Sequence, residues 1–201
     1  MISLMKASAS NVQYAQVRAH IVGADGKDYG EQVLDHHESW GHKLRRLAKK
    51  TLPFLMVGLM ATAALAHHPE VGAVMPAATV ITNGGQAINT NLVSGIGGTV
   101  PRYVAWGTGA GTAAASDTTL FTESSQEART NGTVSRTTTT VTNDTLRVVG
   151  LITVATSGKT ITNVGIFDAS SSGNLFLKSD FTGLALLVGD SITFTIDIKY
   201  S

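Results

Sequence analysis

A glycine-rich stretch, residues 107–111, is the first pattern in this sequence that could do chemistry. Its letters, Gly-Thr-Gly-Ala-Gly, could present backbone amides to a phosphate group. Phosphate-binding loops also need a following helix or a Lys-Ser/Thr pair, and residues 113–116 lead to no lysine. The stretch therefore favours a turn in which glycine adopts backbone angles that other residues avoid.

Histidines and carboxylates gather near the middle of the N-terminal half, where a metal site could be drawn. The residues are of types that bind zinc or nickel: Asp35, His36, His37, Glu38 and His42. Adjacent histidines point to different faces of a helix, however, and His37 falls on an apolar stripe. His67 and His68 end a helix-like run, where capping of the helix dipole is the simpler account. We predict no metal and no other cofactor.

Hydrolase chemistry is formally available because serine, histidine and aspartate are all present. All six histidines precede Pro69, however, whereas the strand-like sequence begins near Thr79. A catalytic triad would have to join the two halves of the chain. Cysteine is absent, so disulfides, thiolate nucleophiles and zinc-thiolate sites are excluded. We therefore predict that the protein is not an enzyme.

The overall charge gives no reason to expect a nucleic-acid partner. The formal net charge is +1, and only 14% of the 201 residues are charged. The sequence is rich in glycine and threonine and poor in aromatic residues. This profile suits close-packed β-structure, or a chain whose surface is covered by neighbours.

The N-terminal half predicts a strand followed by an amphipathic helix. Residues 12–22 alternate like a strand, and Asp25-Gly26 then marks a turn. Over residues 31–50, apolar and semi-apolar positions recur at steps of four and three: Val33, His37, Trp40, Leu44 and Leu47. The spacing is close to a heptad repeat. The opposite face is basic and includes Lys43, Arg45, Arg46, Lys49 and Lys50. It is either a solvated face or a surface for an acidic partner.

An uncharged run over residues 52–66 predicts a second, apolar helix. Its fifteen residues are fewer than the roughly 20 that span a bilayer, so we predict no membrane span. Basic residues before it and Ala64-Leu65-Ala66 at its end also resemble a secretory signal. A third reading, burial by sister subunits or a larger assembly, is the one that we favour, because an exposed surface of this size would aggregate. The predicted assembly contacts are Trp40, Leu44, Arg45, Arg46, Leu47, Phe54, Leu55, Met56, Leu59 and Met60.

The C-terminal half predicts an antiparallel β-domain. Short strand-like runs recur from residue 100 onward, separated by Gly, Asn, Asp and Ser. The clearest is the last, in which Ile192, Phe194, Ile196, Ile198 and Tyr200 alternate with polar residues. Hairpins are predicted around Asn143-Asp144 and residues 169–173.

The predicted fold is mainly β, with a C-terminal antiparallel β-sandwich or jelly-roll-like domain and an N-terminal anchoring arm made of a strand and helices. Residues 1–70 form the anchoring segment, 71–99 a linker and the start of the β-domain, and 100–201 the β-domain. Within the linker, Pro69, Gly72 and Pro76 interrupt regular structure.

An ordered set of motifs from about residue 80 onward resembles a module of tailed-bacteriophage virion proteins. The first motifs are YVAWGTGAGT at 103–112 and DTTL at 117–120, followed by Glu123 and Arg129. The later ones are ITNVGIFDA at 161–169, GNLFL at 173–177, Asp180-Phe181 and GDSI at 189–192. The resemblance implies a small β-domain in a capsid-decorating, neck or tail-fibre protein, located in the virion.

Three functional hypotheses remain open from the sequence. The first is a capsid decoration or cement protein, attached through its N-terminal segment to the major capsid protein or to sister copies, as a homo-oligomer and by analogy a trimer. The second places the same domain plan in the neck or tail of the particle, which the heptad-like spacing over 33–47 favours. The third is a secreted carbohydrate-binding module, which would require cleavage after Ala66 or a membrane tether.

Overall fold

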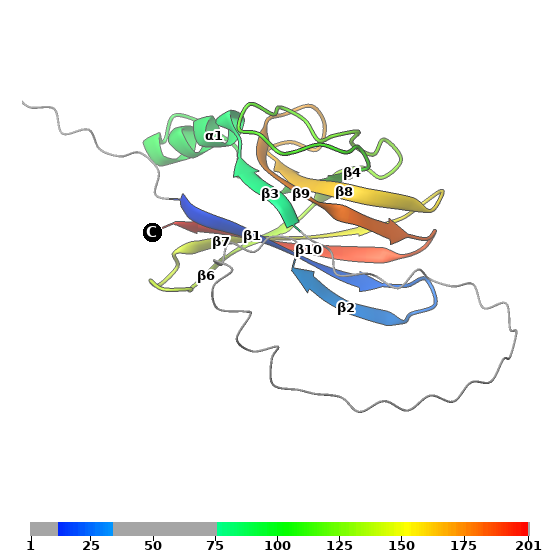
Figure 1. Cartoon of the computed structure of the whole chain (residues 1–201). Helices are drawn as coiled ribbons and strands as arrows, with labels where there is room; N and C mark the ends of the chain where they lie inside the picture. Colours follow the sequence, from blue (N-terminus) through cyan, green and yellow to red (C-terminus); the bar gives the residue numbers. More distant parts are fainter. Residues whose placement is uncertain (1–11, 34–75, 201) are drawn as a thin grey trace, which may run out of the picture.

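Two antiparallel β-sheets stacked face to face make up the described part of the protein (Figure 1). The computed structural model describes residues 12–33 and 76–200. Sheet A contains, in spatial order, β2 (Asp28–Val33), β1 (Val12–Val22), β10 (Ser191–Tyr200), β7 (Thr145–Thr153) and β6 (Thr133–Thr137). Sheet B contains β3 (Pro76–Ile81), β9 (Leu175–Leu186), β8 (Lys159–Phe167), β4 (Tyr103–Gly107) and β5 (Thr130–Asn131). The predicted antiparallel sandwich is confirmed.

The inward residues of sheet A follow the period of two that a strand imposes. In β10, Ile192, Phe194, Ile196 and Ile198 are fully buried. The neighbouring strand β7 contributes Val148 and Ile152 to the same core, together with Val154 just beyond it, while Leu146 packs against it. The strand assignment made from alternation alone is therefore confirmed for β10.

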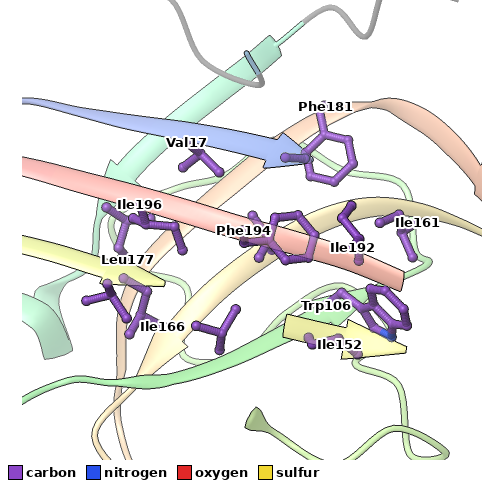
Figure 2. Close-up of a cluster of buried hydrophobic side chains, with 14 of the residues drawn as sticks. Val17, Trp106, Ile152, Ile161, Ile166, Leu177, Phe181, Ile192, Phe194 and Ile196 are labelled. Atoms are coloured by element: carbon purple, nitrogen blue, oxygen red, sulfur yellow. The ribbon is translucent and has the colours of Figure 1, made fainter. Parts of the chain in front are cut away.

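One continuous core fills the space between the sheets. Figure 2 shows Val17 from β1, Trp106 from β4 and Phe194 from β10 within a single layer of apolar side chains. Trp106 is 1% exposed. Each fully buried aliphatic or aromatic side chain contributes roughly 1.5 to 3 kcal/mol relative to an exposed one. A chain without disulfides depends on this layer for its stability.

Sheet B is covered on its outer face as well. The segment 108–129 contains no helix and lies over β4, β8 and β9. It buries Leu120 in a second cluster with Ala105, Phe167 and Leu175, against which Tyr103 packs. Burial on both faces explains why β9 is buried without interruption from Leu175 to Phe181.

Both predicted C-terminal hairpins are present. β8 and β9 pair through the predicted loop at 169–173, and β6 and β7 pair across residues 138–144. The second connection is longer than a two-residue turn. Asn143 has a φ of 60°, and Asp144 accepts hydrogen bonds from the amides of Thr139, Thr140 and Val141. The Asp144 carboxylate thus holds the turn together, and these bonds keep its pKa far below the ordinary value although burial opposes them.

The N-terminal strand belongs to the sandwich. β1 has the predicted bounds and pairs with β10 on one side and β2 on the other. Val17, Ala19 and Ile21 are at most 1% exposed and lie in the main core. The predicted turn is present, with Gly26 at a φ of 79°. The structure therefore places residues 12–33 inside the β-domain, and residues 31–33 in β2 rather than at the start of a helix.

The segment that we had assigned to a linker carries regular structure. Residues 76–81 form β3, and Asn83–Ser94 form the helix α1. Thr82 caps the helix, because its hydroxyl accepts a hydrogen bond from the Gly85 amide at 3.0 Å. Gly95 ends it in the left-handed conformation. The predicted helices over most of 31–50 and over 52–66 lie outside the described residues.

Candidate assembly surface

Helix α1 is fixed to the sandwich at its N-terminal end. A Cβ on Gly85 would lie 2.1 Å from the Phe176 carbonyl oxygen, so only glycine permits this close approach to β9. The buried Thr82 hydroxyl donates to the Leu175 carbonyl oxygen. Ile88, one turn further on, is buried in the main core. The first half of α1 is thus part of the fold.

The C-terminal half of α1 and the loop after it carry apolar side chains into solvent. Val93 is 90% exposed and Ile96 80% exposed. Leu92 and Val100 each expose about a third of their surface and line one cavity together. Apolar side chains gathered on one surface commonly mark a contact site for another protein. We call Leu92, Val93, Ile96 and Val100 the apolar end.

A cavity of about 270 Å³ lies next to the apolar end, between α1 and the edge of sheet A. Leu92 and Val100 form part of its wall. Sheet A supplies Leu146 and Tyr200, and the connection before β4 supplies Pro101. The surface therefore combines protruding apolar side chains with a hollow that could receive a side chain from a neighbour.

Tyr200 holds α1 and sheet A together at this cavity. Its hydroxyl donates to the Asn89 side-chain oxygen at 3.2 Å, and its amide donates to the Asp144 carbonyl oxygen at 2.8 Å. Burial raises the pKa of the Tyr200 hydroxyl, while the Asn89 bond opposes the shift. The hydroxyl is thus neutral at physiological pH and acts as a fixed donor.

All ten predicted assembly contacts lie outside the described residues, between positions 40 and 60. The apolar end was missed because residues 71–99 were assigned to a linker. Two signals could have identified it. Thr82 followed by Ile88 and Leu92 has the cap and the four-residue spacing of a helix, and Gly95 is a typical helix end.

Several residues of the motifs at 103–129 and 161–169 hold the covering segment on sheet B. Arg129 forms a two-pronged ion pair with Glu123, at 2.6 and 3.0 Å, and stacks over the Phe167 ring. The buried Asn163 amide bonds to the carbonyl oxygens of Gly109 and Phe121. These side chains satisfy each other, which assigns them to the architecture of the domain.

The glycines of residues 107–111 are required for a different reason from the predicted one. None of the three has a positive φ. A Cβ on Gly107 would lie 2.3 Å from the Phe121 carbonyl oxygen, and one on Gly111 would lie 2.3 Å from the Phe121 ring. The expected special backbone angles are therefore wrong, and close packing against Phe121 replaces them as the reason. Residues 108–114 form no helix that could hold a phosphate.

The described residues contain few of the groups that a metal site or a catalytic triad would need. No three His, Cys, Asp or Glu side chains within 12–33 and 76–200 are grouped so as to hold a metal ion. His20 is the one histidine in these ranges, and its ring lies 2.9 Å from the Asp28 carboxylate. The Asp35 to His42 group lies outside them. In the same described ranges, no helix has the length and apolar character needed to cross a membrane.

The outer face of sheet A is polar and charged. Asp197 accepts hydrogen bonds from Arg147 at 2.7 and 2.8 Å and from Arg18 at 2.8 Å. This cluster joins β1, β10 and β7 across the sheet. It makes the solvent-facing side of β10 polar, as the alternation of its sequence predicted.

Comparisons of the chain with protein-family models, with curated proteins and with solved structures give no significant match.

Proposed function

We propose that this protein is a structural component of a tailed-bacteriophage virion, and that it decorates the capsid as a cement protein. In this proposal the β-domain projects from the capsid, and the N-terminal segment attaches it to the shell. The proposed partners are the major capsid protein and sister copies of the chain, by analogy in a trimer.

The single observation that carries an assembly role is the apolar end. Val93 and Ile96 expose most of their surface, and Leu92 and Val100 line a cavity. Helix α1 lies at the end of the sandwich where the C-terminus lies (Figure 1). Covering such side chains removes apolar surface from water, at about 25 cal/mol per Å². In a symmetric shell the same small contact is repeated many times, so modest interfaces give firm attachment.

The resemblance in the sequence supplies the kind of particle. Its motifs run in the order found in phage virion proteins, and in this structure they form the packing of one β-domain. Glu123, Arg129 and Asn163 bond within the domain, which supports a scaffold role for them. A role in assembly uses the motif residues as scaffold and leaves the apolar end for contact.

Particle composition and labelling test the proposal. Phage particles are purified from the bacterium that carries this gene, their proteins are identified by mass spectrometry, and the chain is located by cryo-electron microscopy. Density repeated over the icosahedral shell is expected. Density confined to the neck or tail would move the protein to the alternative station, and absence from purified particles would overturn the proposal.

A pair of variants tests the apolar end itself. Ile96→Asp places a charge in the proposed contact and should reduce incorporation of the chain into particles at least tenfold. Val188→Asp is the matched control, because Val188 is 48% exposed in the turn between β9 and β10. Equal incorporation of both variants would show that the apolar end makes no contact in the particle.

A further inference from the structure

A lysine is fully buried beneath the covering segment of sheet B. Lys178 lies on β9 and its side chain is 0% exposed. Its Nζ lies 3.0 Å from an Asp117 carboxylate oxygen and 2.8 Å from the centre of the Phe121 ring. Removing an ammonium group from water is costly, and this one has one carboxylate and one aromatic face in return. Lysines are rarely buried so completely.

A second carboxyl group is buried in the same place. Asp180 is two residues further along β9, on the same face as Lys178, and is 3% exposed. Neither of its carboxyl oxygens has a hydrogen-bond partner of normal geometry among the described residues. Burial raises the pKa of Asp180, and the charge of Asp117 raises it further, while the Ala113 amide and Lys178 oppose these effects. The arrangement favours a neutral carboxylic acid at this position.

The three groups together meet the requirements for forming an amide bond. The Lys178 amine is fully buried and lies 3.0 Å from a carboxylate oxygen of Asp117, whose side chain is 20% exposed, and the buried acid Asp180 lies close by. Fixing two reactants in this way can replace a very high concentration of either one, with effective molarities on the order of 10⁵ M or more. The Asp117 carboxylate also accepts a hydrogen bond from the Ala114 amide at 3.1 Å, and this bond and Lys178 keep its pKa below the ordinary value although burial opposes them. The reaction therefore begins from the ion pair.

We infer that Lys178 and Asp117 become joined by an isopeptide bond between Nζ and Cγ, with Asp180 transferring the protons. This inference concerns the maturation of the domain and does not depend on a role in a virion. Nothing besides the three side chains is consumed or required.

The step balances within the cluster. A proton first passes from the Lys178 ammonium to the Asp117 carboxylate, which gives a neutral amine and a carboxylic acid. The Nζ lone pair then attacks Cγ, and Asp180 donates its proton to the oxygen that departs. The C–O bond breaks, one water molecule leaves, and Asp180 recovers a proton from Nζ. The product is a neutral amide plus water, and Asp180 ends as it began.

The bond would form a covalent loop between residues 117 and 178. It would tie the covering segment to β9 of sheet B. In a chain without cysteine, this supplies a cross-link that disulfides cannot. Such a link resists local opening of the segment even when the surrounding packing is disturbed.

A second lysine pair in the same domain is an internal control. Lys159 Nζ lies 2.6 Å from a Glu127 oxygen and is also mostly buried. Glu127, however, accepts further hydrogen bonds from Ser124 and the Ala155 amide, which together with Lys159 lower its pKa to about 2 although burial opposes them. Lys159 also divides its donors between Glu127 and the Gln126 side-chain oxygen, whereas Lys178 has Asp117 and the Phe121 ring. We expect an ordinary ion pair there.

Mass spectrometry of the denatured full chain tests the inference. We expect an intact mass one water lighter than the sequence predicts, after allowance for the initiator methionine. Trypsin should fail to cut after Lys178 and should release a branched peptide that joins 103–129 to 160–199, while cutting normally after Lys159. A chain at the full sequence mass, with cleavage after Lys178, would overturn the inference without any variant having to fold.

Two substitutions separate the roles. Asp117→Asn should lose ammonia instead of water and reach the same product mass as the wild type. Asp180→Asn should leave the chain at its full mass while the domain remains folded by circular dichroism. If the Asp180→Asn chain is still cross-linked, the bond stands and the proton-transfer role of Asp180 is wrong.

Discussion

At the scale of single residues, buried charges hold the connecting segments in place. Glu127 is 8% exposed and receives hydrogen bonds from Lys159, the Ala155 amide and Ser124. Burial alone would raise the pKa of Glu127, but these hydrogen bonds outweigh burial and lower the pKa from 4.5 to about 2. The ionised form is therefore favoured by folding. The carboxylate links residues 123–129 to the start of β8.

The lowered pKa of Glu127 predicts a specific pH dependence of stability. Because the folded value lies below the unfolded one, its contribution is complete above about pH 4.5 and disappears as the pH falls toward 2. The full contribution is about 3 kcal/mol, from 1.36 kcal/mol per pKa unit over the fall from 4.5 to about 2. Glu127→Gln should lower the free energy of unfolding by about this amount at pH 7, and by much less near pH 2. Urea unfolding at both pH values measures this loss of free energy.

The control is Glu31→Gln, because the Glu31 side chain is half exposed. An equal loss for Glu127→Gln at both pH values would contradict the prediction.

Close packing at Gly107 predicts a second residue effect. The added Cβ of Gly107→Ala would lie 2.3 Å from the Phe121 carbonyl oxygen and 2.6 Å from the Asn163 side chain. Either the covering segment or β4 must shift, so we expect a loss of at least about 2 kcal/mol in the free energy of unfolding. Ala110→Ser, at an exposed position of the same segment, should change it by less than about 0.5 kcal/mol. Thermal unfolding of the two variants decides, and equal stability would mean that the segment yields without cost.

At the scale of elements, the cap of α1 determines whether the apolar end is presented. The Thr82 hydroxyl both caps the helix at the Gly85 amide and donates to a carbonyl oxygen of β9. Thr82→Ala should therefore cost about 1 to 2 kcal/mol in the free energy of unfolding. Thr82→Ser keeps the hydroxyl and should recover most of the loss. Chemical unfolding followed by circular dichroism measures both, and a serine variant as weak as the alanine variant would exclude the hydroxyl as the cause.

Elements with a strict period were predictable from sequence, whereas those defined by their partners were not. β10 alternates over its whole length, and β1 ends at an Asp-Gly turn, so both have their predicted bounds. β3 and α1 are short and rich in Ala, Asn and Gly, and their stability comes from contact with β9. Residue 31 was assigned to a helix because its neighbours 33 and 37 match a helical step, but pairing with β1 makes 31–33 a strand.

The Lys178 cluster and the apolar end also differ in how far the sequence could predict them. Lys178 and Asp180 are buried on β9, and they lie 61 and 63 positions after the partly exposed Asp117. No local pattern in the sequence predicts that Asp117 meets them. The residues of the apolar end are close together in sequence. Whether they are exposed depends on which apolar residues of α1 the sandwich covers. Ile88 is buried and Ile96 is exposed, although both are isoleucines at related positions of one segment. Sequence identifies such residues as apolar, and only the fold separates core from contact surface.

At the scale of the whole molecule, the sandwich joins the two ends of the described chain. β1 lies between β2 and β10, so the first described strand pairs with the last along almost its entire length. The composition change near residue 70 therefore does not mark the start of the folding unit. Residues 34–75 connect two strands that both belong to it, β2 in sheet A and β3 in sheet B.

This topology predicts the outcome of two N-terminal truncations. A chain that begins at residue 12 keeps every core contact described here and should retain a cooperative unfolding transition. A chain that begins at residue 28 lacks β1, and with it the buried Val17, Ala19 and Ile21. Val17 and Ile21 alone account for roughly 3 to 6 kcal/mol of burial, and the pairing edge of β10 is exposed as well. Because whole domains are stable by only about 5 to 15 kcal/mol, the shorter chain should be unfolded or aggregated. Calorimetry and size-exclusion chromatography distinguish the cases. A folded, monomeric chain beginning at residue 28 would show instead that the β-domain begins after the composition change, with β1 as an attached arm.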